Sequence, residues 1–169
     1  AAVTVGVDDT GYDFKVFGAT AGKSLHWLSI ANQFIISGTF KTVTAGTSNF
    51  MAGEAAGDSI VSGGNYNVCV GDQAGTAIST GDDNTFVGYA AGDALDEGKA
   101  NVAIGLNSLG SDTFGCRSVA IGHAALFNQN FTSETNASNV AIGHSAGAGI
   151  TDGTENTLIG GYIHDNLTA

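Results

Sequence analysis

The chain repeats the segment Asn-Val-Ala-Ile-Gly, which stands at residues 101–105 and 139–143 and, with serine first, at 118–122. Seven segments follow this pattern of a polar residue, three mostly apolar residues and a glycine. They begin at residues 49, 67, 84, 101, 118, 139 and 156, so successive starts are 18, 17, 17, 17, 21 and 17 residues apart. A tandem repeat of this period, and not a motif for any single site, must determine the fold.

We number the residues of each repeat from its first residue and call each number a column. The residue types within a column indicate the structural role of that position. Column four is always apolar, and column eight is small in the first six copies, which suits a narrow interior. Column one is asparagine in six copies, which predicts a ladder of stacked side-chain amides. Column five is always glycine, which predicts a corner with positive φ or close backbone approach; these repeat corners are Gly53, Gly71, Gly88, Gly105, Gly122, Gly143 and Gly160.

Column fifteen is glycine in five copies and predicts a second corner. A unit of 17 residues with two glycine corners is too short for two helices, but it fits one coil of a β-solenoid. Each coil would add a rung of about 4.8 Å. The predicted fold is therefore all-β. It is a parallel β-solenoid (β-roll) of about seven coils that forms a shaft over residues 49–169, preceded by a small β-rich module over residues 1–48.

Strand alternation places columns two and four on one face and column three on the other. We expect columns two and four to face inward and column three outward, and the reverse arrangement is the alternative. Column three carries no charge in any copy, and column two is mostly valine. Either arrangement leaves an uncharged stripe facing outward, which predicts an oligomer.

Composition excludes several classes of protein. Charged residues are 12% and hydrophobic residues 43%, which argues against disorder, and 26 glycines without a proline argue against collagen. No apolar run is long enough for a membrane span, and a net charge of −11 argues against nucleic-acid binding. Without an initial methionine or a signal-peptide pattern, we expect a processed chain or part of a longer one.

Longer stretches of the repeat carry a resemblance to known families. N-T-F-V-G-Y-A-A-G at 84–92, S-V-A-I-G-H-A-A-L at 118–126 and N-V-A-I-G-H-S-A-G at 139–147 resemble the head repeats of trimeric autotransporter adhesins. They also resemble the N-T-A-I-G-Y-x-A-L repeats of tailed-phage fibre proteins. The resemblance recurs along residues 49–169 and implies a homotrimer of parallel β-solenoids.

The first 48 residues do not share the repeat. The segment G-V-D-D-T-G-Y-D-F-K-V-F-G-A-T-A-G-K at 6–23 predicts an alternating strand, including Tyr12, between two turns. The residues around Trp27 and Ile30, followed by N-Q-F-I-I-S-G-T-F at 32–40, predict a further strand pair. This stretch is similar to a module of tailed-phage structural proteins, which implies a virion protein. We expect it to cap the first coil or to dock other virion proteins.

The resulting hypothesis is a non-enzymatic, structural component of a trimeric phage tail or capsid fibre on the virion surface. It would support or perform attachment to a host-surface glycan or protein, with no cofactor. A bacterial trimeric adhesin at the cell surface is the alternative. A polysaccharide depolymerase is a further one, because such an enzyme needs paired carboxylates and this chain has many, although solvated aspartates are ordinary in turns; they include Asp82, Asp83, Asp93, Asp96, Glu97, Asp112, Asp152 and Glu155.

The 21-residue repeat holds an insertion around residues 128–136, and solenoid insertions often form the binding face. A tolerated loop without a partner is the favoured interpretation. In the functional alternative, an exposed Phe131 among amides stacks on a sugar ring, and the candidate receptor-binding residues are Asn128, Asn130, Phe131 and Glu134.

Two further pairs of residues could carry chemistry. His123 and His144 share one column and are weak candidates for a metal site, since the same column is a variable surface position in other copies. No metal site is therefore predicted. Cys69 and Cys116 are 47 residues apart, so buried free thiols are expected, with a disulfide as the alternative.

Overall fold

The structure, a computed structural model, describes residues 14–17, 24–28, 33–37 and 44–163. The chain separates into two compact units, Ala1–Lys41 and Thr42–Ala169. Every regular element among the described residues is a β-strand. The described part of the chain is therefore all-β, as the sequence predicts.

In the first unit, β2 lies between two antiparallel neighbours in a three-stranded sheet of β1 (Phe14–Phe17), β2 (Ser24–Leu28) and β3 (Gln33–Ser37). Phe14 is paired with Trp27 in this register. Tyr12 and Ile30, which the sequence places in strands, lie outside the described residues. So do residues 38–43, on which a capping role for this module depends.

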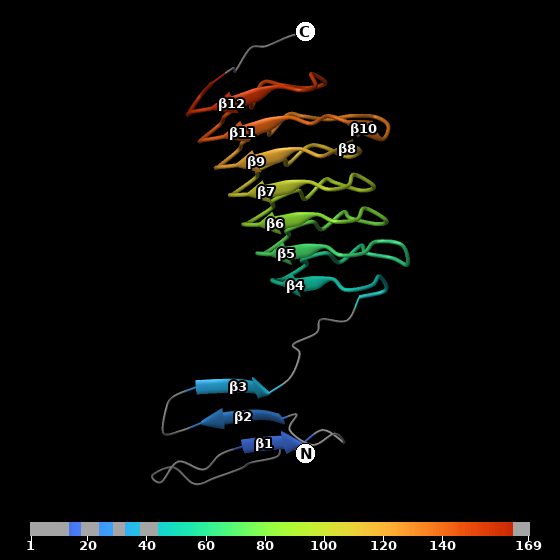
Figure 1. The fold of residues 1–169 in the computed structure, drawn as a ribbon, viewed down its shortest axis with the longest axis vertical. Coiled ribbons are helices and arrows are strands. Elements are labelled where there is room, and N and C mark those ends of the chain that lie inside the picture. The colour runs from blue at the N-terminus through green and yellow to red at the C-terminus, as the bar shows by residue number, and fades with distance from the viewer. Residues whose placement is uncertain (1–13, 18–23, 29–32, 38–43, 164–169) are drawn as a thin grey trace. The chain divides into compact units, whose positions relative to one another are not determined.

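In the second unit, seven parallel strands stack in chain order (Figure 1). Each strand occupies columns two to four of one repeat and pairs with the next at the same columns, as Val102, Ala103 and Ile104 pair with Val119, Ala120 and Ile121. Seven strands in this order delimit about six turns of a β-solenoid, so the predicted solenoid is confirmed. The strands are β4 (Phe50–Ala52), β5 (Val68–Val70), β6 (Thr85–Val87), β7 (Val102–Ile104), β9 (Val119–Ile121), β11 (Val140–Ile142) and β12 (Thr157–Ile159).

Column three faces the interior, so the expectation that columns two and four face inward is wrong. Phe86, Ala103 and Ala120 in column three are completely buried, whereas Val87 and Ile104 in column four are exposed. A strand of three residues has one side chain on one face and two on the other. The opposite wall of the coil, built from columns eight and twelve, leaves room for only the single side chain.

Side-chain volumes at columns three and nine compensate for one another in two consecutive coils. Phe86 fills its coil beside Gly92, where an added Cβ would lie 2.5 Å from the phenylalanine ring. In the next coil Ala103 leaves space in column three, and Leu109 replaces the glycine of column nine. Both residues of that coil are fully buried. In these two coils a large side chain at one of the two columns is therefore accompanied by a small residue at the other, which keeps the cross-section of the coil similar.

The column-five glycines form corners, with φ between 130° and 147°, as the sequence predicts. An added Cβ at Gly88 would lie 2.8 Å from the carbonyl carbon of Gly105, so neighbouring coils approach too closely there for any side chain. Column seven and the last residue of the first six repeats are also left-handed, although none of these residues is glycine. The φ angle is 59° at Gln73 and 60° at Asp83.

Candidate functional site

The outward side of the seven-stranded sheet, which we call the sheet face, contains no charged residue. The exposed fraction reaches 38% at Ile104 in the middle strand and 66% at Ile159. Such a regular apolar surface is a typical site of protein association. The sheet face consists of Phe50, Ala52, Val68, Val70, Thr85, Val87, Val102, Ile104, Val119, Ile121, Val140, Ile142, Thr157 and Ile159.

Both edges of the sheet face extend the apolar surface. Tyr89 and Leu106 follow corner glycines along one edge and are 50% and 42% exposed, and Tyr66 precedes β5 on the other edge with 58% exposed. The edges also hold the nearest charges, which are Glu54 and Asp72 after the corners, and Asp83, Arg117 and Glu155 before the strands. An apolar centre with a mixed border is the usual anatomy of a protein interface.

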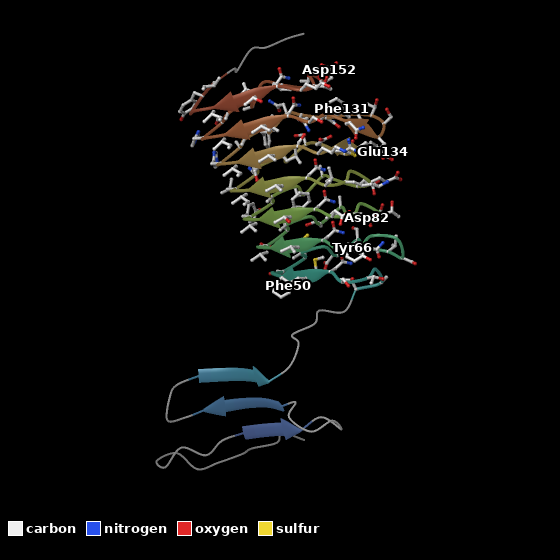
Figure 2. The ribbon with its side chains drawn as sticks, viewed as in Figure 1. Phe50, Tyr66, Asp82, Phe131, Glu134 and Asp152 are labelled. Carbon is white, nitrogen blue, oxygen red and sulfur yellow. The ribbon has the colours of Figure 1, made fainter. Side chains whose placement is uncertain are left out.

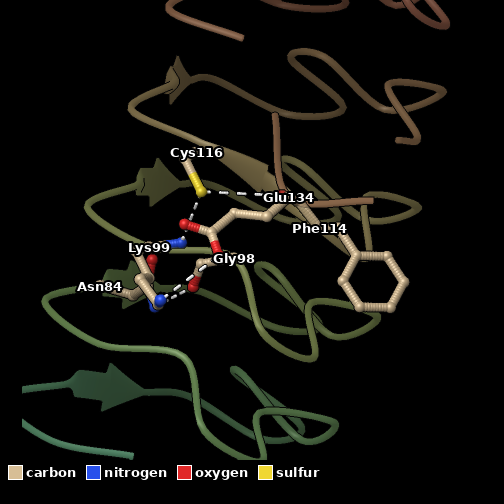
Figure 3. Close-up of polar contacts among 6 residues, drawn as sticks. All are labelled: Asn84, Gly98, Lys99, Phe114, Cys116 and Glu134. Atoms are coloured by element: carbon tan, nitrogen blue, oxygen red, sulfur yellow. Dashed lines mark hydrogen bonds and ion pairs between the residues drawn. The ribbon is translucent and has the colours of Figure 1, made fainter. Parts of the chain in front are cut away.

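The asparagines of column one form the predicted ladder inside the solenoid. The Asn84 backbone N–H donates to Asn67 Oδ1, and the Asn101 N–H donates to Asn84 Oδ1, each at 3.0 Å. Asn84 Nδ2 also donates to the carbonyl of Gly98 at 3.0 Å (Figure 3). All three asparagines are fully buried. These hydrogen bonds therefore connect neighbouring coils, and they also connect Asn84 to the column-fifteen glycine at the second corner of its own coil.

The insertion does not present Phe131 to solvent. Asn128, Asn130 and Glu134 are exposed, but Phe131 is only 7% exposed. Figure 2 labels Phe131 and Glu134 in this part of the stack. The insertion lies along the stack because β10 (Thr135–Asn136) pairs in parallel with β8 (Gly115–Cys116). The alternative in which an exposed Phe131 ring stacks on a sugar is therefore wrong, and the exposed groups of the insertion are polar.

The insertion also makes an ion pair with an earlier coil. Lys99 Nζ lies 3.5 Å from Glu134 Oε2, and both side chains are substantially exposed (Figure 3). An exposed pair of this kind typically contributes less than about 1 kcal/mol. The Glu134 side chain is 61% exposed, so its carboxylate remains accessible to another molecule.

The two histidines are adjacent but do not converge on a common point. Their rings are stacked, with centroids 4.6 Å apart at an angle of 27°, and the Tyr162 ring lies 4.8 Å from that of His144. Among the described residues, no group of three or more His, Cys, Asp or Glu side chains could hold a metal ion. The arrangement is an aromatic stack along one edge of the solenoid.

Cys69 and Cys116 are both free and buried, which confirms the expectation of buried thiols over a disulfide. Burial raises the pKa of the Cys69 thiol to about 12. The Lys99 backbone N–H donates to Cys116 Sγ at 3.3 Å (Figure 3). Both sulfurs therefore belong to the packing of the stack, and Cys69 is neutral at physiological pH.

We expect Cys69 to resist alkylation in the folded protein. With a pKa of about 12, only about one thiol in ten thousand is ionised at pH 8, and the sulfur is sealed from solvent. Mass spectrometry after iodoacetamide treatment should find Cys69 unmodified in buffer and modified in concentrated urea. Modification in buffer at the rate of an unfolded peptide would contradict the packing.

Three of the carboxylates considered for a depolymerase make local structural contacts. Asp112 is fully buried and accepts backbone hydrogen bonds, Asp82 accepts from the backbone and amide of Asn65, and Asp96 accepts from a serine of the preceding coil. Burial raises the pKa of Asp93, partly offset by backbone hydrogen bonds. These contacts run along the stack, and nothing in them favours a catalytic pair in a cleft.

Comparison with known proteins finds no family model, curated protein or solved structure that matches this chain. Among the described residues, no helix is long and apolar enough to cross a membrane. The sheet face and the exposed polar groups of the insertion are therefore the candidate functional surfaces. The sequence predicted an apolar stripe, but it did not identify the columns that form it.

Proposed function

We propose that this chain forms part of the shaft of a homotrimeric phage fibre, in which three solenoids pack their sheet faces around a common axis. The fibre would belong to the tail or the capsid, lie on the virion surface and support attachment to a host glycan or protein. The module at residues 1–48 would dock other virion proteins. The role is structural, without catalysis and without a cofactor.

The observation that carries the proposal is the uncharged sheet face. Two columns of side chains run along all seven strands without one charge, although the chain as a whole has a net charge of −11. Exposed strands normally alternate apolar and polar faces, and here both faces are apolar. A second apolar face along the solenoid is explained if other copies cover it.

The geometry favours other copies of this chain as the partners that cover the sheet face. The face has the same regular spacing as the coils, so an identical solenoid would match it rung for rung. Three copies around one axis also bring the apolar edge residues Tyr66, Tyr89 and Leu106 toward neighbouring chains. The resemblance of the repeats to trimeric fibre and adhesin heads supports three copies over two.

Attachment to the host rests on the insertion. Asn128, Asn130 and Glu134 are exposed and carry amide and carboxylate groups, which can hydrogen-bond a carbohydrate or a protein. The insertion belongs to the coils of β8 to β11, on residues outside the sheet face, so assembly would leave it accessible. Its role is therefore proposed as polar recognition without the aromatic contribution of Phe131.

Sedimentation of the full chain tests the proposal. At micromolar protomer concentration we expect a single species with three times the 16.9 kDa mass of one chain. A species of one chain mass under the same conditions would overturn the shaft proposal. Immunogold labelling with antibodies to the solenoid would separate the two proposed settings, since label on phage fibres supports the virion role and label on bacterial cells contradicts it.

A further inference from the structure

The repeat pattern is broken at columns one and twelve in two adjacent coils. Column one holds Ser118 in place of asparagine, and column twelve holds Asp112 and Gln129 in two adjacent coils. All three residues are fully buried. In the other described coils column twelve is a buried aliphatic side chain, namely Ile60, Ile78, Leu95 and Ile150. Three polar exceptions in contact with one another call for a common explanation.

The undisturbed ladder shows what the asparagine side chain does. Asn84 Oδ1 accepts the N–H of Asn101 at 3.0 Å and its Nδ2 at 3.2 Å, while Asn84 Nδ2 donates to Gly98 and to Asn67. A serine cannot make these contacts, because it has one short hydroxyl group in place of the amide. Ser118 would therefore leave the Asn139 amide without its partner in the preceding coil.

Gln129 supplies the missing amide from column twelve. Asn139 Nδ2 donates to Gln129 Oε1 at 2.7 Å, which is the bond that an asparagine at position 118 would accept. Gln129 Nε2 donates to Ser118 Oγ at 3.1 Å and to Asp112 Oδ2 at 2.6 Å. The short Ser118 side chain leaves the space that the glutamine amide occupies.

Asp112 connects this amide to the start of the insertion. Its Oδ1 accepts the backbone N–H of Gly115 at 3.0 Å and that of Phe131 at 3.2 Å, while its Oδ2 accepts from Gln129. Phe131 stands two residues beyond Gln129, where the chain leaves the regular coil. One buried carboxylate thus holds both the substitute amide and the root of the insertion.

We propose that Asp112, Ser118 and Gln129 act as one positioning unit, in which the Gln129 amide replaces the asparagine missing from the ladder and fixes the root of the insertion. The insertion is then an anchored segment and not a tolerated surface loop. Its exposed residues Asn130 and Glu134 are presented from a rigid base. The unit is internal to one chain and does not depend on the proposed trimer.

A double-mutant cycle between positions 118 and 129 tests the unit. Gln129→Ala removes the amide, and Ser118→Asn alone forces two amides into one space, so each should raise the unfolding equilibrium constant. Together the two substitutions restore a single amide. We therefore expect the unfolding equilibrium constant of the double variant to be about tenfold smaller than independent effects of the two single substitutions would give. Additive effects would overturn the proposal. If Gln129→Ala fails to fold, recovery of folding in the double variant is the same rescue.

Asn84→Ser is the matched control, because it makes the same serine rung beside Leu95, where no glutamine is available. We expect at least a tenfold rise in its unfolding equilibrium constant, and a neutral effect would show that serine needs no substitute amide. Hydrogen exchange at the Phe131 amide distinguishes anchoring from general stability. When the two variants are compared under conditions that give them the same free energy of unfolding, this exchange should be about tenfold faster in Gln129→Ala and unchanged in Asn84→Ser. Equal exchange rates in the two variants would contradict the anchoring role.

Discussion

Ile104→Glu is expected to convert the proposed homotrimer into monomers while leaving the solenoid folded. Ile104 lies on β7, the middle strand of the sheet face, and its side chain is 38% exposed within one chain. A glutamate there adds little strain to the monomer. In a packed trimer it would bury three carboxylates near one axis, where desolvation and mutual repulsion each oppose association. We expect association to weaken at least about a hundredfold.

Thr132→Glu is the matched control for this prediction. It adds the same charge at an exposed residue of the insertion, away from the sheet face. Sedimentation should show the control as an oligomer and Ile104→Glu as one chain, with the same β-type circular dichroism for both. An oligomer that persists in Ile104→Glu would show that another surface holds the copies together.

Gly105→Ala is expected to destabilise the stack strongly, although it adds only one methyl group. The φ angle of Gly105 is 130°, and an added Cβ would lie 2.6 Å from both the carbonyl carbon and oxygen of Gly122. These are backbone atoms of the next coil, so they move only if the rungs separate. Backbone strain and overpacking together should cost about 3 to 5 kcal/mol of unfolding free energy.

The control for Gly105→Ala is Gly161→Ala. At Gly161 the nearest atom to an added Cβ is the His144 carbonyl oxygen at 3.7 Å, which is ordinary contact. Urea unfolding at one fixed protomer concentration should place this variant within about 1 kcal/mol of the parent. Equal stability of the two alanine variants would mean that the corners tolerate a side chain and that the rungs are not held as closely as described.

The repeat made the architecture predictable. Seven glycines at one column and six asparagines at another allow few structures other than a parallel stack, and both the corners and the ladder are present. Which columns face inward could not be read from hydrophobicity, because columns two, three and four are all apolar. Volume carries that information, since Phe86 stands with Gly92 and Ala103 with Leu109 in their coils.

The 21-residue coil was harder to interpret, because its extra residues obscure the columns. Gln129 belongs to column twelve, but a loop that begins at residue 128 hides that assignment, and Phe131 is then expected at the surface. The signal in the sequence is the coincidence of Asp112, Ser118 and Gln129 as exceptions in adjacent coils. The left-handed residues at column seven and at the end of the first six repeats give no such signal, because none of them is glycine.

The same-column pairing of every strand has an evolutionary consequence. In-frame duplication of the stretch that encodes one regular coil, such as residues 84–100, would add one rung and leave every other contact in place. The length of the solenoid can therefore change by recombination in steps of about 4.8 Å. The coils that share Asp112, Ser118 and Gln129 are the exception, because a break between them would separate the partners, so lineages should gain and lose that stretch only as a block.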